Sequence, residues 1–166
     1  MEVALLTAAI VSTFAGATTL LRSWRNDRQA RRQARRRPRG KQAADGASSL
    51  EVVLQDGGPR VQSEYDRDFA RLGELFGRGD FSGLPDDGRE PSPADLRKEM
   101  GRSQLKDHVI VLQGTIITLL QNAQDRALPA IPQLGLILGN SEASRDGAIT
   151  ALANQYQRML QTKPIE

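Results

Sequence analysis

The 166-residue chain contains no cysteine and a single histidine, His108. The absence of cysteine excludes a disulfide framework, a thiol nucleophile and a thiolate zinc site. His108 has no second histidine or cysteine with which to build a site, so we expect an ordinary residue on a helix surface. The sequence also has no phosphate-binding loop, nucleophile elbow or zinc-protease motif. We therefore expect no enzyme, and no catalytic, cofactor-binding or metal-binding residues.

Aromatic residues are scarce, at 4%, and the apolar share of 39% lies below that of a typical globular chain. The chain also carries 15 glycines and 8 prolines. This composition indicates that only part of the chain forms a packed core. The length leaves room for one domain with tails.

Charge is distributed very unevenly along the chain. Residues 22–41 hold ten basic residues and one acid, Asp27, for a local balance of +9. Because the net charge of the whole chain is +3, the other residues together carry −6. The sequence therefore reads as an uncharged head, a basic collar and a mildly acidic body.

The head, residues 3–21, has no charged residue. As a helix it would be ~28 Å long, close to the ~30 Å hydrocarbon core of a bilayer. Trp24 stands where an interfacial aromatic would lie, and basic residues follow the apolar run. This order predicts a membrane anchor at 1–24, single-pass, with the C-terminal part in the cytosol; the outer mitochondrial membrane and the endoplasmic reticulum are not distinguished. The expected lipid-contacting residues are Leu5, Leu6, Ile10, Phe14, Leu20, Leu21, Trp24, Arg22, Arg25 and Arg28.

Two other interpretations of this N-terminal region stay open. The head could pack in the bundle as a core helix, permanently or until a trigger releases it. The collar and linker occupy residues 25–47. Their basic segment RRQARRRPRGK also fits a nuclear import signal or a nucleic-acid-binding patch. Residues 25–41 contain no aromatic side chain to stack on bases, which disfavours binding to a single strand.

The first part of the body shows two apolar stripes separated by a break. Residues 42–47 form a small-residue linker, and Ser48 with Glu51 predicts a capping box for a short helix. Gly57-Gly58 is expected to end that helix, and Pro59 to begin the next. A loop at 77–93, acidic and mobile, should follow. The two stripes consist of Leu50, Val53 and Leu54, and of Val61, Tyr65, Phe69, Leu72 and Phe76.

The second part of the body predicts two further helices. Ser92 is the expected N-cap of the first, with Pro93 at its first position, and Ser92 is also a candidate phosphorylation site. The apolar face of this first helix consists of Leu105, Val109, Leu112, Ile116, Leu119 and Ala123, and Ile110, Ile117 and Leu120 widen it. β-Branched runs allow a strand there, but length and period favour a helix. Ser141 or Ser144 should cap the last helix, whose apolar face is Ile149, Leu152, Tyr156, Met159 and Leu160.

These patterns predict an all-α fold: an N-terminal transmembrane-like helix with an Arg-rich extension, then a small antiparallel bundle at 48–162. Two segments resemble uncharacterised small helical proteins of filamentous fungi, which share an EYDRxxARLG segment. They are residues 59–80 (PRVQSEYDRDFARLGELFGRGD) and residues 103–123 (SQLKDHVIVLQGTIITLLQNA). Residues 1–24 also resemble the start of fungal cell-death domains. That resemblance implies a leading helix able to enter membranes.

The leading functional hypothesis is a membrane-tethered, non-enzymatic helical adaptor. It would contact membrane lipid through its head and another protein through its bundle. The first alternative is a membrane-active switch whose N-terminal helix inserts on activation. The second is a nuclear or RNA-associated protein that uses the Arg-rich segment.

Overall fold

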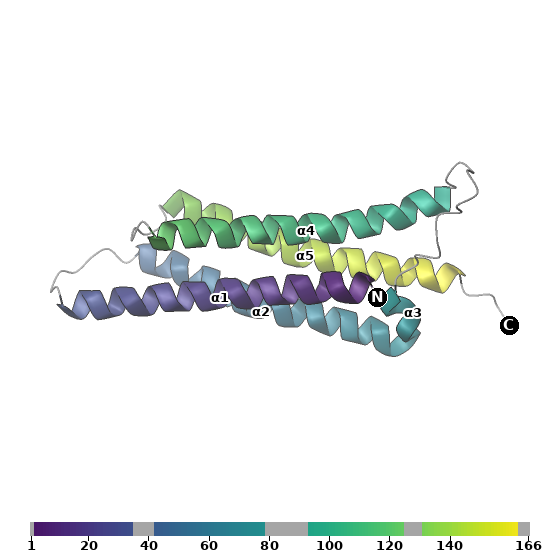
Figure 1. Ribbon diagram of the computed structural model, residues 1–166, viewed down its shortest axis with the longest axis horizontal. Helices are drawn as coiled ribbons and strands as arrows, with labels where there is room; N and C mark the ends of the chain where they lie inside the picture. Colours follow the sequence, from purple (N-terminus) through teal and green to yellow (C-terminus); the bar gives the residue numbers. More distant parts are fainter. Residues whose placement is uncertain (1, 35–41, 79–92, 125–130, 163–166) are drawn as a thin grey trace.

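The structure is a computed structural model that describes residues 2–34, 42–78, 93–124 and 131–162. Throughout these ranges the secondary structure is helical and no strand occurs, as the all-α prediction required. Four long helices form an elongated bundle, and one short helix lies at its end (Figure 1). The helices are α1 (Glu2–Ala34), α2 (Gln42–Leu72), α3 (Glu74–Arg78), α4 (Pro93–Gln124) and α5 (Ile131–Thr162).

The bundle consists of two helical hairpins packed side by side. α1 and α2 are antiparallel neighbours, and so are α4 and α5 (Figure 1). The hairpins meet through α1 against α4 and α2 against α5, and each of these pairs runs in the same direction. Each long helix therefore has two neighbours and one outward side.

α1 is a full member of this bundle, which is the packed arrangement that the sequence left open as an alternative. Its buried positions advance in steps of four and three residues, so they form one stripe along the helix. The helix continues to Ala34, past the expected anchor at 1–24 and into the predicted Arg-rich extension. The stripe consists of Val3, Thr7, Ile10, Phe14, Ala17 and Leu21.

The predicted break at Gly57-Gly58 and Pro59 is wrong, because α2 runs through all three residues. A Cβ atom on Gly57 would lie 2.4 Å from Cε1 of Phe14, so this glycine makes room for the Phe14 ring of α1. The two glycines serve helix packing rather than helix termination. Residues 42–47, predicted to be a linker, form the first turns of α2.

The real end of α2 lies at Gly73, which the sequence analysis placed inside a helix. Gly73 has a φ of 65°, a left-handed conformation that strongly favours glycine. Its amide donates to the carbonyl of Phe69 at 2.7 Å, which closes the helix end. The chain then turns into α3, and there Phe76 is fully buried with its ring 5.7 Å from that of Tyr65.

The predicted series on α4 is confirmed in its central part. Leu105, Leu112 and Leu119 are buried, and Val109 and Ile116 pack against them. The predicted widening of this face is wrong. Its three members point outward, with exposed fractions of 64% for Ile110, 55% for Ile117 and 40% for Leu120.

α5 begins at Ile131, ten residues before the first expected cap. Ser141 is buried inside the helix, and its hydroxyl donates to the carbonyl of Ile137 at 2.8 Å. On the predicted face Leu152 is buried and Ile149 is partly buried, whereas Leu160 is 41% exposed. Residues 79–92, which include Ser92 and most of the predicted acidic loop, lie outside the described residues.

Candidate membrane-interaction surface

α1 contains one segment, Glu2–Asp27, that is long and apolar enough to cross a membrane, and 33% of its most apolar stretch is buried inside the bundle. The core helix of a soluble protein and a signal sequence share these properties. The functional question is therefore what holds this helix in place and what it presents outward.

The residues predicted to contact lipid divide between the two sides of α1. Leu5 points outward and is 67% exposed. Leu6, Leu20 and Trp24 are partly buried. The side chain of Arg28 lies outside the described residues. Ile10, Phe14 and Leu21 are buried against the other helices.

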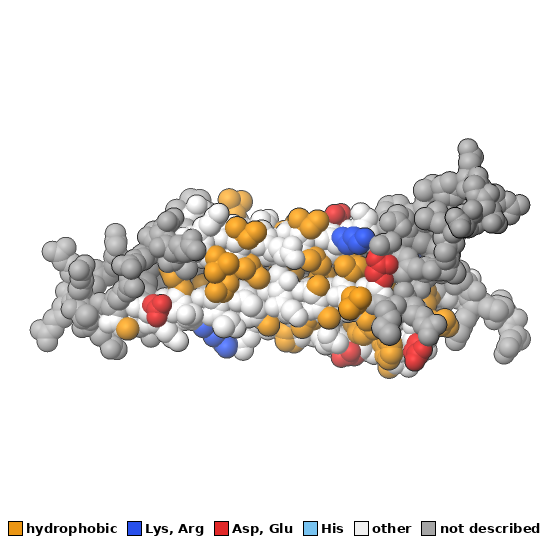
Figure 2. Space-filling model, viewed as in Figure 1, with side chains coloured by type: hydrophobic (Ala, Val, Ile, Leu, Met, Phe, Trp, Pro, Cys, Tyr) orange, Lys and Arg blue, Asp and Glu red, His pale blue; other side chains and the backbone are white. Residues whose placement is uncertain are grey.

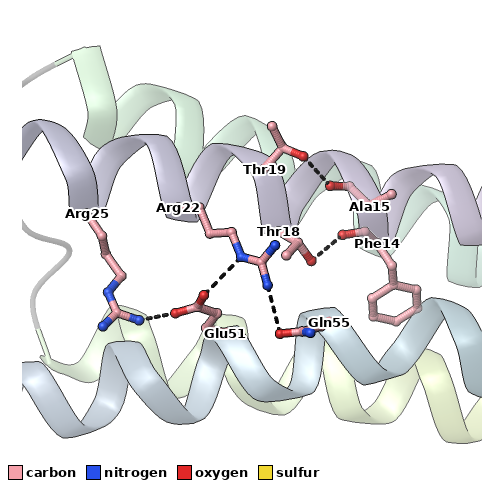
Figure 3. Close-up of polar contacts among 8 residues, drawn as sticks. All are labelled: Phe14, Ala15, Thr18, Thr19, Arg22, Arg25, Glu51 and Gln55. Carbon is pink, nitrogen blue, oxygen red and sulfur yellow. Dashed lines mark hydrogen bonds and ion pairs between the residues drawn. The ribbon is translucent and has the colours of Figure 1, made fainter.

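Two of the predicted lipid-contacting arginines pair with residues of α2 in the closed bundle (Figure 3). Arg22 donates through Nε to Oε1 of Glu51 at 3.1 Å and through Nη2 to the side-chain carbonyl of Gln55 at 2.9 Å. Arg25 pairs with the other carboxylate oxygen of Glu51. We call these four residues the α1–α2 clasp. The Arg22 side chain is 50% exposed, so each such pair contributes at most about 1 kcal/mol.

The clasp was not predicted from the sequence. Ser48 and Glu51 predicted a capping box, but α2 begins at Gln42 and both residues lie inside the helix. The partners stand 26 to 33 positions apart in the chain, so no local pattern joins them. The sequence offered one signal, which was that Glu51 is an acid on a predicted helix and could pair with the arginines after the head.

Beside the clasp, the Phe14 ring lies over Gly57 and Gly58. A Cβ atom on Gly58 would lie 3.4 Å from both the Phe14 Cβ and the Val11 carbonyl oxygen, so the helices approach closely here. Phe14 itself is fully buried. This contact anchors the middle of α1 more firmly than the exposed arginines do, because it depends on shape and apolar burial.

Thr7 is a weak point in the packing of α1. It is 1% exposed, and its hydroxyl has no hydrogen-bond partner among the described residues. A buried hydroxyl without a partner costs about 1–3 kcal/mol. The N-terminal half of α1 is therefore held less favourably than its apolar stripe alone suggests.

The outward sides of α1 and α4 form one uncharged surface. Residues 3–21 of α1 and 109–121 of α4 contain no charged side chain. Figure 2 shows hydrophobic side chains over the middle of these helices, with charged groups only toward the ends. We call this surface the neutral face. Its exposed large apolar residues are Leu5 (67%), Ile110 (64%), Val111 (40%), Ile117 (55%) and Leu120 (40%).

Charged residues continue along the middle of the other two long helices, whereas α1 carries them only at residue 2 and from residue 22, and α4 only before residue 109. α2 and α5 pack against each other on the side of the bundle away from α1 and α4. The middle of the bundle is therefore amphipathic, with a neutral and a charged side. The charged residues of that side are Glu51, Asp56, Arg60, Glu64, Asp66, Arg67 and Arg71 on α2, and Glu142, Arg145, Asp146 and Arg158 on α5.

Threonine hydroxyls on α1 and α4 bond back to their own helices. Thr13 donates to the carbonyl of Ala9 at 2.6 Å, and Thr19 to that of Ala15 at 2.9 Å. On α4, Thr118 donates to the carbonyl of Gly114 at 2.9 Å. Hydroxyl groups inside a membrane are satisfied in this way, without a partner outside the helix.

His108 lies at the junction of α4 and α5, partly buried. Burial lowers its pKa, and the neighbouring Asp107 opposes this shift. A Cβ atom on Gly147 would lie 2.2 Å from the His108 ring, so the ring fits against a bare patch of α5 backbone. Over the described ranges no group of three or more His, Asp or Glu side chains is placed to hold a metal ion. His108 therefore has a packing role.

The chain belongs to a family defined by a domain of unknown function, DUF8759, whose model matches residues 1–164. The match covers almost the whole chain, which agrees with the resemblance to an uncharacterised family. No curated protein and no solved structure is similar to the chain. The family description assigns no activity.

Proposed function

We propose that this member of the DUF8759 family is a non-enzymatic membrane-active switch, in which α1 is stored in the bundle and inserts into a membrane on activation. The observation that carries the proposal is the double character of α1. The helix is long and apolar enough to span a bilayer, yet its apolar stripe packs against α2 and α4. The basic collar after it stays on the cytosolic side when α1 inserts.

The packed and inserted positions of α1 exclude each other. Gly57 of α2 lies opposite Phe14 near the middle of the head. An α1 that spanned the bilayer while still packed would therefore carry Asp56, Arg60 and Glu64 of α2 into the lipid. Each charged side chain costs at least ~2.5 kcal/mol at the centre of a bilayer. Insertion therefore requires α1 to separate from α2, and this two-state character is what makes the protein a switch.

The contacts that hold α1 in the bundle suit release. The clasp is partly exposed and can be exchanged, because lipid phosphates can replace the Glu51 carboxylate as partners of Arg22 and Arg25. The unpaired hydroxyl of Thr7 opposes the packed state. Against these stands the buried apolar stripe of α1, which includes the Phe14 contact with Gly57 and Gly58.

A permanently tethered adaptor is the second candidate. The length and hydropathy of Glu2–Asp27 favour it. In that state α2, α4 and α5 would stand without α1, and Leu50, Leu54 and Leu112 would lose cover. That apolar surface would need a partner protein. We rank the switch first because it accounts for the packed α1 without a second molecule.

The test places a probe at the middle of α1. The chain has no cysteine, so Ser12→Cys can carry one environment-sensitive fluorophore on the exposed side of α1. With vesicles of phosphatidylcholine and phosphatidylserine, we expect the probe to be quenched most strongly by lipids that carry the quencher at the bilayer centre.

The matched control is Asn154→Cys, an exposed position on α5. Its probe should stay open to an aqueous quencher with and without vesicles. A Ser12 probe that remains as open to the aqueous quencher as the Asn154 probe would overturn the switch.

A further inference from the structure

The neutral face has a use before α1 moves. It covers two parallel helices over ~28 Å, if 19 residues of α1 rise at ~1.5 Å each. On its α4 half, Ile110 and Ile117 stand one heptad apart and are 64% and 55% exposed. They are the most exposed of the residues on α4 for which a core role was predicted. Insertion of α1 does not need them.

We propose that the closed bundle docks on an anionic membrane surface through the neutral face, with Ile110 and Ile117 of α4 as lipid-contacting residues. This inference rests on the proposed function, because it supplies the step that precedes insertion. Docking lays α1 and α4 in the plane of the membrane and leaves α2 and α5 toward water.

Charge placement selects a lipid surface as the occupant. The neutral face has no acidic residue to repel anionic headgroups, and Arg22 marks its end where the basic collar begins. The opposite end carries the Glu2–Lys106 ion pair, with 3.9 Å between the charged atoms, and the exposed Asp107, so the basic end is the one that attracts anionic lipid. A basic segment next to an exposed apolar surface binds anionic membranes through both contributions.

The polar groups of the neutral face agree with lipid rather than protein. A protein interface offers roughly one hydrogen bond per 100–200 Å². Here the hydroxyls of Thr13, Thr19 and Thr118 are already bonded to their own helices. Gln113 and Gln121 are exposed and neutral, with side chains long enough to reach the headgroup layer.

The experiment separates docking from insertion by locking α1 to α2. A Cβ atom on Gly58 would lie 3.7 Å from Cγ1 of Val11, so Val11→Cys with Gly58→Cys can form a disulfide after a small adjustment. In the oxidised protein α1 stays in the bundle. Flotation with vesicles of phosphatidylcholine and phosphatidylserine, and with phosphatidylcholine alone, then measures docking only.

In the locked protein, Ile110→Gln with Ile117→Gln should lower the affinity for the anionic vesicles about tenfold or more, since two exposed isoleucines lose their lipid contact. The matched control, Val52→Gln with Leu136→Gln, changes residues that are 65% and 67% exposed on α2 and α5. It should leave the affinity within about twofold. Circular dichroism confirms that each variant is folded.

Four results would overturn the docking inference. The α4 and control variants could weaken binding equally, or the locked protein could fail to bind while the reduced protein binds. The locked protein could bind vesicles of phosphatidylcholine alone as tightly as anionic ones. Light scattering without vesicles could show a dimer that the α4 variant dissociates, which would make the neutral face an interface between copies. Docking by the locked protein, combined with a Ser12 probe that never enters the bilayer, would instead overturn the switch and leave docking intact.

Discussion

At the scale of the residue, glycines decide how closely α1 approaches its neighbour. Gly57 faces three atoms of the Phe14 ring at 2.4–2.7 Å from the position of a Cβ, whereas the same atom on Gly114 would meet nothing within 4 Å. Both residues lie inside long helices. Substitution of Gly57 therefore tests close packing, whereas substitution of Gly114 tests only the effect of glycine on helix stability.

Gly57→Ala should lower the free energy of unfolding by about 1–3 kcal/mol, because the ring must shift in a closely packed contact. Gly114→Ala should raise it by about 0.5–1 kcal/mol, since alanine is the better helix former. Urea denaturation followed by circular dichroism measures both. A stabilising Gly57→Ala would show that Phe14 does not pack as described.

The free energy of unfolding should depend on pH because of His108. Its pKa is lowered by burial, so the folded protein binds a proton less readily than the unfolded chain, whose histidine has a pKa near 6.5. Stability is therefore full above about pH 6.5 and falls as the pH drops through that value toward the folded pKa.

Thermal unfolding of the wild type and of His108→Gln should reveal this contribution. Between about pH 7.5 and about pH 5.5, the Tm of the wild type should fall further than the Tm of the variant, which lacks the titrating group. Equal falls would mean that the His108 ring is as well solvated in the folded protein as in the unfolded chain.

At the scale of the element, α1 is held by its buried apolar stripe and by weaker polar contacts. Thr7→Val replaces a buried hydroxyl that has no hydrogen-bond partner in the described part of the chain with a methyl group of similar shape. We expect the bundle to gain about 1 kcal/mol. The gain should also raise the amount of anionic lipid needed for insertion.

Thr18→Val is the control for that change. Thr18 is 8% exposed, and its hydroxyl donates to the carbonyl of Phe14 at 2.8 Å. Replacing this hydroxyl with a methyl group therefore removes an existing hydrogen bond. The stability of this variant should stay the same or fall slightly. Chemical denaturation and vesicle titration of both variants test the pair, and a Thr7→Val bundle less stable than the wild type would contradict the expectation.

The clasp makes a separate prediction for the contact between α1 and α2. Glu51→Gln removes the one carboxylate that pairs with both Arg22 and Arg25. We expect insertion at a lower content of phosphatidylserine and a loss of stability of at most about 1 kcal/mol. Glu64→Gln is the control, because Glu64 pairs with Arg67 inside α2. Equal vesicle responses in the two variants would exclude a role for the clasp.

The elements also show how far the sequence could predict this fold. The central stripe of α4 and the helical class followed from the spacing of apolar residues, which the core reproduces. The continuity of α2 could not be predicted, because Gly57-Gly58-Pro59 reads as a helix stop until the Phe14 ring from another helix is placed on it. The exposed side of α4 was misread for a similar reason. An apolar residue carries no sign of whether a neighbour will cover it, and α4 has more such residues than two neighbours can bury.

The candidate surface was predicted only in part. The uncharged head and the basic residues after it were evident from composition, and they identified α1 as the unusual helix. Its partners were not evident, since Glu51 and Gln55 lie about 30 positions from the arginines that they bind. The neutral face depends on α1 and α4 standing side by side. That pairing joins segments about 100 residues apart, which no local pattern records.

At the scale of the whole molecule, the bundle has two unlike sides. Residues 3–21 of α1 and 109–121 of α4 present neutral surface, whereas α2 and α5 carry charge along their middle parts. A helical bundle that is surrounded by water needs charged side chains on every outward side. The uncharged side of this bundle is accounted for if it meets a membrane and if α1, which lies on that side, can pass into it.

The most direct measurement compares the Val11→Cys, Gly58→Cys protein in its oxidised and reduced forms after incubation with anionic vesicles. Alkaline carbonate extraction removes docked protein and leaves inserted protein in the membrane pellet. The reduced form should resist extraction, whereas the oxidised form, with α1 fixed to α2, should be released. Equal resistance of the two forms, or complete release of the reduced form, would contradict the account that α1 leaves the bundle to enter the bilayer.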